Sequence, residues 1–265
     1  MARKEKTMTG QKILAVVALA GLLLSGRAQA ANSIEGKEFI ELRVYSFKSA
    51  DKRKAYNEFL KTAAVPALNR AGVDRIGVFV DKKPENLNLY MVLPHKSLES
   101  FATSTRKIMA DQEYLAAGKT ILGSTKQDPA YERIESNLFV SFDMVPKLVA
   151  PAQKAPARVF QLRIYEAHNV ERGHKKIHMF NEGGEVKLFR DAGMHPVFFG
   201  EAIAGTKIPN LTYMITFENE EAQKAAWQTF INGEGWKKLK SDPVYKDTVS
   251  HITNLVLSPT EASQL

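Results

Sequence analysis

The sequence of 265 residues contains no cysteine. This absence excludes disulfide bonds, thiol nucleophiles, zinc sites with thiolate ligands and iron–sulfur clusters. The G-x-G-x-x-G and Walker A phosphate loops, the G-x-S-x-G nucleophile elbow and the H-E-x-x-H zinc motif are also missing. The sequence therefore assigns no catalytic residue, leaves open whether the protein is an enzyme, and predicts no cofactor.

Strong charge of one sign is missing from most of the chain. The formal net charge is +8, and half of this excess lies in the first 30 residues. No dense cluster of Lys and Arg interleaved with aromatic residues follows, so we expect no nucleic-acid partner. With 44% hydrophobic and 25% charged residues, the composition is that of an ordinary globular protein.

A hydrophobic run long enough to span a membrane is also missing. Ile13–Leu24 is an uncharged run of 12 residues, whereas a bilayer-spanning helix needs about 20. The basic stretch Arg3–Lys12 precedes it, and Ala28-Gln29-Ala30 places small residues where signal peptidase cleaves. The pattern predicts a signal peptide over residues 1–30, cut after Ala30, and an exported protein, periplasmic or secreted, without membrane contact after cleavage. An uncleaved anchor is the alternative.

The remaining chain contains the same pattern twice. Phe39–Tyr45 matches Val159–Tyr165 at an offset of 120 residues, and Asp128–Tyr131 matches Asp242–Tyr245 at an offset of 114. Two further pairs match at offsets of 121 and 123, namely Arg70–Gly72 with Asp191–Gly193, and Asn88–Val92 with Leu211–Ile215. The constant order predicts a duplicated unit, with domains at 37–146 and 158–259. Residues 147–157, which are rich in proline and alanine, form the predicted linker.

Each copy has the same predicted order of elements, βαββαβ. The expected strands are 39–46, 76–80, 87–93 and 134–144, then 158–167, 195–203, 210–217 and 248–257. The expected helices are 50–71, 97–109 and 111–122, then 170–192, 219–231 and 234–241. This order is typical of a ferredoxin-like unit, an antiparallel sheet with both helices on one face. The predicted fold is therefore α+β, with two tandem ferredoxin-like units packed sheet to sheet as a closed barrel.

Strand alternation separates Leu42 and Val44 from Arg43 and Tyr45. We expect the aliphatic pair to lie under the helices, and Arg43 and Tyr45 to face the space between the two sheets. The same argument places Arg163 and Tyr165 there from the second copy. A buried guanidinium needs a partner, which is either a structural ion pair or an anionic or carbonyl-bearing ligand beside a tyrosine hydroxyl.

Histidines add two candidates and one weak alternative. His168 and His195 lie near predicted strand ends, where we expect the mouth of the barrel. They complete a candidate ligand-binding set with Arg43, Tyr45, Arg163 and Tyr165. His174 and His178 are four residues apart on a predicted helix, with Glu182 one turn later. They are weak metal-ligand candidates, because an exposed helix face has the same residue types. No metal site is predicted.

Several of these motifs resemble the NIPSNAP family. In the second copy the resemblance rests on Leu162–Glu166, His168-Asn169, Pro196–Glu201 and Pro209–Met214, and in the first copy mainly on Glu41–Tyr45. The resemblance implies an exported protein with two tandem NIPSNAP domains that form a dimeric α/β barrel within one chain. Relatives in that superfamily include cofactor-free and haem-handling monooxygenases, isomerases and dye-decolourising peroxidases. Because no general reaction is established for NIPSNAP domains, the resemblance assigns no catalytic residues.

Three hypotheses for function follow. The preferred one is an exported binding protein or unassigned enzyme that encloses a small anionic or carbonyl-bearing ligand between its two sheets. The second is a protein–protein interaction module whose barrel is filled with side chains. The third is a cofactor-free enzyme similar to monooxygenases. A homo-oligomer is compatible with all three.

Overall fold

Eight antiparallel strands form where the sequence alternates, and they close into a barrel in the order β1-β3-β2-β8-β5-β7-β6-β4. The computed structural model describes Met1 and residues 34–265. All but the first residue of the predicted signal peptide lies outside these residues. The strands are β1 (Phe39–Ser46), β2 (Gly77–Asp81), β3 (Leu89–His95), β4 (Arg133–Ser141), β5 (Val159–Glu166), β6 (His195–Ala204), β7 (Asn210–Phe217) and β8 (His251–Pro259).

Each half contributes a four-stranded ferredoxin-like sheet, β4-β1-β3-β2 and β8-β5-β7-β6. The edge strands of the two sheets pair with each other, β2 with β8 and β4 with β6. These two seams close the barrel and remove all sheet edges. The predicted α+β architecture of two packed ferredoxin-like units is confirmed, and residues 36–265 form one compact unit.

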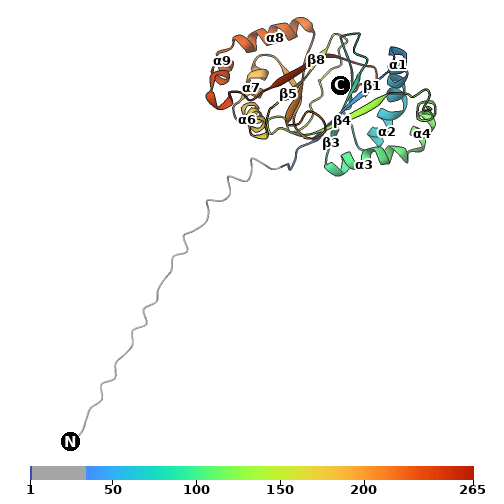
Figure 1. The fold of residues 1–265 in the computed structure, drawn as a ribbon, viewed down its shortest axis with the longest axis horizontal. Helices are drawn as coiled ribbons and strands as arrows, with labels where there is room; N and C mark the ends of the chain where they lie inside the picture. Colours follow the sequence, from blue (N-terminus) through green and yellow to red (C-terminus); the bar gives the residue numbers. More distant parts are fainter. Residues whose placement is uncertain (2–33) are drawn as a thin grey trace. The chain divides into compact units, whose positions relative to one another are not determined.

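The helices of the two halves cover the outside of the strands on opposite sides (Figure 1). In the first half they are α1 (Ala50–Phe59), α2 (Val65–Arg70), α3 (Leu98–Met109), α4 (Gln112–Ala117) and α5 (Lys119–Leu122). In the second half they are α6 (Val170–Phe180), α7 (Glu185–Asp191), α8 (Glu220–Asn232) and α9 (Glu234–Ser241). No helix within the described residues combines the length and apolar character that a membrane crossing requires.

Both long helices expected after the first strand of each half are interrupted. In the first half, a π-helical segment, Leu60–Ala64, separates α1 from α2, and Pro66 lies in the first turn of α2. Proline has no N–H to donate within a helix, which agrees with a break in the regular α-helix just before it. In the second half, α6 and α7 are separated at Gly184, whose φ of 84° lies in the left-handed region that glycine adopts without strain.

The barrel interior is apolar, and the expected orientation of the first strands is wrong. Leu42 and Val44 belong to the interior cluster together with Leu162, whereas Tyr45 belongs to the cluster under the helices of the first half. An eight-stranded barrel is just wide enough for side chains to fill it. Apolar side chains from both halves occupy this interior, so Arg43 and Arg163, which alternate with them, face the helices of their own half.

The register also corrects one of the repeat offsets. Arg43 lies opposite Met91 on β3, and Arg163 lies opposite Tyr213 on β7. Met91 and Tyr213 are therefore equivalent, which makes the offset 122 rather than 123. A slip of one residue moves a strand residue to the other face of the sheet, and Tyr90 accordingly lies in the barrel interior while Tyr213 lies under the helices.

The predicted linker lies in a stretch without helix or strand between β4 and β5. This stretch packs against the barrel. Leu148 is buried in the interior cluster, and the backbone N–H of Val149 donates to the carbonyl of Val197 at 2.9 Å. The segment that joins the two halves is therefore part of the packed structure.

Candidate functional site

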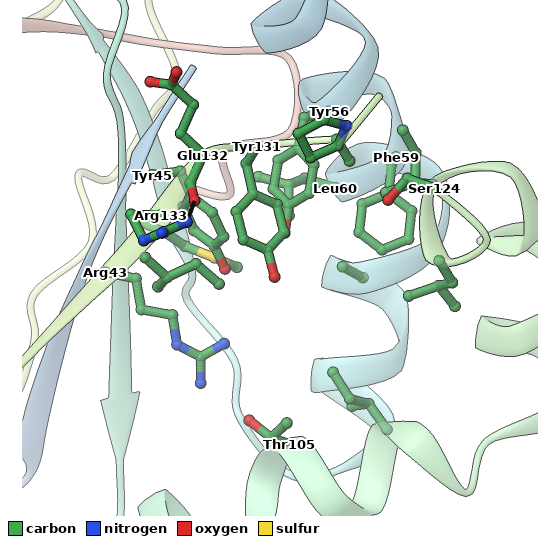
Figure 2. A pocket seen from close by; sticks show the side chains of 18 of the residues that line it. Arg43, Tyr45, Tyr56, Phe59, Leu60, Thr105, Ser124, Tyr131, Glu132 and Arg133 are labelled. Atoms are coloured by element: carbon green, nitrogen blue, oxygen red, sulfur yellow. Dashed lines mark hydrogen bonds between the residues drawn. The ribbon is translucent and has the colours of Figure 1, made fainter. Parts of the chain in front are cut away.

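A cavity of about 740 Å³ lies in the first half, between the sheet and its helices. Arg43 and Tyr45 project into it from β1, and Tyr56 and Phe59 come from α1 (Figure 2). Further lining residues come from β4, α3, α4, α5 and the loop before β4, among them Thr105, Ile108, Met109, Tyr114, Leu122, Tyr131, Ile134 and Ser136. This volume lies in the range of pockets that enclose small molecules.

Arg43 is held at one edge and open at the other. Its Nε donates to Oε1 of Glu41 at 2.6 Å, and its side chain is 13% exposed. Figure 2 shows the guanidinium group turned into the open part of the cavity, near the hydroxyl group of Tyr45. Because the bond to Glu41 uses Nε, the edge formed by Nη1 and Nη2 is presented to the cavity. That edge matches the two oxygens of a carboxylate.

Glu41 is the buried partner that fixes this geometry. Its side chain is 2% exposed. Oε1 also accepts from Oγ of Ser136 at 2.7 Å, and Nε2 of His95 donates to Oε2 at 3.2 Å. Burial alone raises the pKa of Glu41, but the hydrogen bond from His95 and the charge of Arg43 outweigh it and lower this pKa to about 2. Glu41 is therefore ionised at neutral pH and keeps Arg43 in place.

Tyrosines surround the guanidinium group. The rings of Tyr45 and Tyr131 meet edge to face with centroids 5.8 Å apart, and those of Tyr56 and Tyr131 do so at 5.4 Å. Figure 2 shows the hydroxyl groups of Tyr45 and Tyr131 pointing into the space that Arg43 faces. Burial and the neighbouring Tyr45 raise the pKa of Tyr56, so its hydroxyl stays protonated and able to donate.

The equivalent arginine of the second half has a different environment. The Cζ atom of Arg163 lies 4.8 Å from the ring centroid of Trp227 and 5.3 Å from that of Tyr165. Gln161 replaces the carboxylate of Glu41, and its Oε1 accepts from Nε1 of Trp227 at 2.7 Å. Nε of Arg163 is buried without a hydrogen-bond partner among the described residues. Arg163 is thus packed between aromatic rings.

A buried ion pair fills more of the space between the sheet and the helices of the second half. Lys176 occupies the position equivalent to Tyr56, and its Nζ donates to Oε2 of Glu185 at 2.7 Å, with side chains 6% and 2% exposed. Nζ also lies 4.6 Å from the ring centroid of Phe180, a cation–π distance. Burial raises the pKa of Glu185, and Lys176 opposes this shift. The two halves therefore share a fold but differ in what lies between sheet and helices.

Residues 160–264 match the family model of NIPSNAP. The second half of the chain is thus similar to the NIPSNAP family. The match begins at β5 and runs through β8, so it covers the whole ferredoxin-like unit of that half. The first half has the same strand order as this matched half, and its sequence contains the same repeated motifs.

Solved structures agree with this fold. A monooxygenase-like protein from Fusobacterium nucleatum has a TM-score of 0.57 at 11% identity, over 84% of this chain and 92% of its own. A monooxygenase-like protein from Lactobacillus acidophilus has a TM-score of 0.57 at 12% identity, over 84% and 94%. A NIPSNAP family protein from Agrobacterium tumefaciens is 18% identical over 46% and 95%, with a TM-score of 0.33. Curated proteins include no match. The first two likenesses show that the chain has the dimeric α/β-barrel fold.

The structure does not bring the six candidate residues together. Arg43 and Tyr45 share the cavity, while Arg163 and Tyr165 lie in the second half of the chain, on the other side of the barrel. His168 follows β5 and His195 begins β6, and both are exposed. Since β5 and β6 both pair antiparallel with β7, these two histidines lie at opposite ends of the sheet. The expected common site at the mouth of the barrel is wrong.

The weak metal-ligand candidates have other contacts in the structure. Among residues 34–265, no group of three or more His, Asp or Glu side chains is placed to hold a metal ion. Nε2 of His174 lies 3.2 Å from Oε1 of Glu201, and Nδ1 of His178 lies 2.9 Å from the hydroxyl of Tyr245. His174 and His178 thus lie on the surface of α6, whereas Glu182 lies in the turn after this helix, which ends at Phe180.

Sequence reasoning missed most partners of Arg43. Alternation places Glu41 on the same face of β1 as Arg43, but spacing along the chain does not show that β3 places His95 beside Glu41. Tyr131 had a detectable signal, since it ends the Asp-Pro-x-Tyr motif that recurs at Tyr245. A motif that recurs before the last strand of both halves marks a residue that packs against the helices.

Proposed function

We propose that the protein binds a small molecule with a carboxylate or carbonyl group in the cavity of the first half. The observation that carries this proposal is the buried guanidinium of Arg43, held at Nε by Glu41 and open to a cavity of about 740 Å³ at its other edge. The proposed site therefore lies between sheet and helices, and not between the two sheets as the sequence suggested.

The residues that line the cavity have different roles in the proposed binding. Arg43 holds the anionic or carbonyl oxygen, and the hydroxyl groups of Tyr45 and Tyr131 donate to neighbouring oxygens of the ligand. Glu41 is a positioning residue. A carboxylate with a pKa of about 2 is a weak base at neutral pH, so Glu41 is suited to fixing Arg43 rather than to removing a proton. Binding is therefore favoured over acid–base catalysis.

Calorimetric titration with a panel of short carboxylic acids and ketones tests this proposal. Arg43→Met should weaken binding of the best ligand by about 10- to 100-fold, the loss expected for hydrogen bonds to a charged group. Arg43→Lys should recover only part of it, because an ammonium group does not offer two parallel donors. Arg163→Met is the matched control at the equivalent position and should leave affinity unchanged. Equal affinity in all variants, or no binding by any compound, would contradict the proposal.

A second candidate, the interaction module, is favoured by one observation. The barrel interior is occupied by apolar side chains from both halves, as that hypothesis requires. In this case the cavity beside Arg43 has no small-molecule ligand. The same titration separates the two, since an interaction module predicts that none of the acids or ketones binds.

We also propose that the protein is exported through a cleaved signal peptide. Export is supported by the sequence of the first 30 residues, with its basic stretch, short apolar run and Ala-x-Ala ending. N-terminal sequencing of the protein from the exported fraction should start at Ala31. A chain that starts at Met1 and stays with the membrane fraction would favour the uncleaved anchor.

A further inference from the structure

Exposed apolar side chains border the cavity of the first half. Met109 at the end of α3, Leu122 at the end of α5 and Ile134 in β4 are 50%, 38% and 42% exposed. All three line the cavity, so they form its opening. A single exposed apolar residue is ordinary on a protein surface. Three exposed apolar side chains from separate elements around one opening favour a ligand with an apolar group that passes between them.

The apolar surface continues inward from this opening. Ile108, Leu60 and Leu68 are buried, line the cavity and pack in the cluster under the helices. Of the cations that line the cavity, Arg43 is the innermost, with a side chain 13% exposed, while Lys126 and Arg133 are exposed. The cavity thus combines one inner guanidinium group, paired at Nε with Glu41, with an apolar path from that group to solvent.

We propose that the ligand is a single-chain amphiphile, with a carboxylate head at Arg43 and a linear hydrocarbon tail that reaches the opening at Met109, Leu122 and Ile134. This inference rests on the proposed function and adds the class of ligand. A carboxylate head fits because one guanidinium edge matches its two oxygens. A phosphate head would carry further negative charge into a cavity where, among the described residues, the one inner cation is already paired with Glu41.

The shape of the tail follows from the tyrosines. Tyr45, Tyr56 and Tyr131 already meet one another at interplanar angles of 43°, 81° and 76°. These contacts occupy ring surfaces that a planar aromatic ligand would need for stacking. The side chains beyond them, Leu, Ile and Met, are aliphatic and have no ring faces for stacking, and Met adapts to irregular shapes. They therefore enclose an alkyl chain better than a rigid plate.

Titration calorimetry with a homologous series tests the tail. The probes are sodium butanoate, hexanoate, octanoate, decanoate and dodecanoate, each below its micelle concentration. Affinity should rise about fourfold for each added methylene, as expected for a buried CH₂, and should level off once the chain passes the opening. Methyl decanoate, which lacks the negative charge, and decyl phosphate, which has a different anionic group, test the carboxylate head. The compound 2-naphthoate tests whether a planar ring system can replace the alkyl tail. We expect all three to bind at least tenfold more weakly than decanoate.

Variants of the opening link the tail to its place in the structure. Leu122→Gln and Met109→Gln should weaken dodecanoate by about tenfold and leave butanoate unchanged. Leu98→Gln is the matched control, because Leu98 is 46% exposed on α3 but does not line the cavity. It should change neither affinity.

The outcomes separate this inference from the function on which it rests. Affinity that does not rise with chain length, or tighter binding of 2-naphthoate than of decanoate, overturns the alkyl tail while binding at Arg43 stands. Tighter binding of decyl phosphate overturns the carboxylate head. If no acid of the series binds, the proposed function fails together with the inference.

Discussion

Arg43 and Arg163 occupy equivalent positions in the two halves, yet their guanidinium groups have different partners. Arg43 donates from Nε to Glu41 at 2.6 Å, whereas Arg163 lies 4.8 Å from the ring centroid of Trp227. The change from Glu41 to Gln161 between the halves accounts for much of the difference. Only Glu41 supplies a negative charge that fixes the orientation of its arginine.

Glu41→Gln should change how stability depends on pH. The pKa of Glu41 is lowered from 4.5 to about 2, so its contribution to the free energy of unfolding is fully present above pH 4.5. It is lost as the pH falls toward 2, and it amounts to about 3 kcal/mol. Urea unfolding between pH 7 and pH 2 should therefore show a shallower loss of stability in Glu41→Gln than in the wild type.

The control for this prediction is Glu135→Gln, which removes an exposed carboxylate from the neighbouring strand β4. It should follow the wild-type curve within about 0.5 kcal/mol, the usual range for surface substitutions. Parallel curves for Glu41→Gln and the wild type would show that Glu41 has an ordinary pKa in the folded protein.

The Lys176–Glu185 pair should be strongly coupled. Both side chains are buried, so removing one partner leaves a buried charge and should cost about 3–5 kcal/mol. The double variant Lys176→Met with Glu185→Leu removes both charges and should be more stable than either single variant by about 2–4 kcal/mol. A double-mutant cycle by chemical denaturation measures this coupling.

The exposed pair Lys187 and Asp191, one turn apart on α7 with side chains 71% and 53% exposed, provides the comparison. Its coupling should be below about 1 kcal/mol. If the buried pair shows a coupling as small as this, water reaches Lys176 and Glu185 in solution.

Gly200→Ala should weaken the seam between β4 and β6. Gly200 lies opposite Ser141 across this seam, and a Cβ at this position would be 2.6 Å from Cβ of Phe139. We expect a loss of about 1–3 kcal/mol, as for overpacking of a core. Thermal unfolding monitored by circular dichroism checks this value.

The matched glycine is Gly173 within α6. A Cβ there would meet its nearest neighbours at 3.6 Å, an ordinary contact, and alanine is the better helix former by about 0.8–1 kcal/mol. Gly173→Ala should therefore raise the melting temperature. A lower melting temperature for Gly173→Ala, or an unchanged one for Gly200→Ala, would contradict the packing described here.

The fold could be predicted from sequence because the duplication gives two independent indications of each element. Strands such as Phe39–Ser46 and Asn210–Phe217 have the bounds that the alternation indicates. The break at Gly184 has a clear local cause, the left-handed conformation. Closure of the barrel also follows from physical reasoning, since two bare sheet faces have to be buried.

The site could not be predicted because alternation defines two faces of a strand without saying which one meets the helices. The sequence places Leu42 and Arg43 on opposite faces, and either assignment satisfies the pattern. The structure shows that apolar residues from all eight strands pack together in the interior, which decides the orientation. The partnership of Glu41 with His95 depends on pairing across 54 residues, which local spacing does not reveal.

The continuity of the chain from β4 to β5 has an evolutionary consequence. When two identical subunits assemble such a barrel, every substitution is copied into both of them, so their two binding chambers must change in step. Joining the copies in one polypeptide frees each from the other. One half can keep an open cavity while the other acquires an internal ion pair and aromatic filling, as the contrast between Tyr56 and Lys176 illustrates.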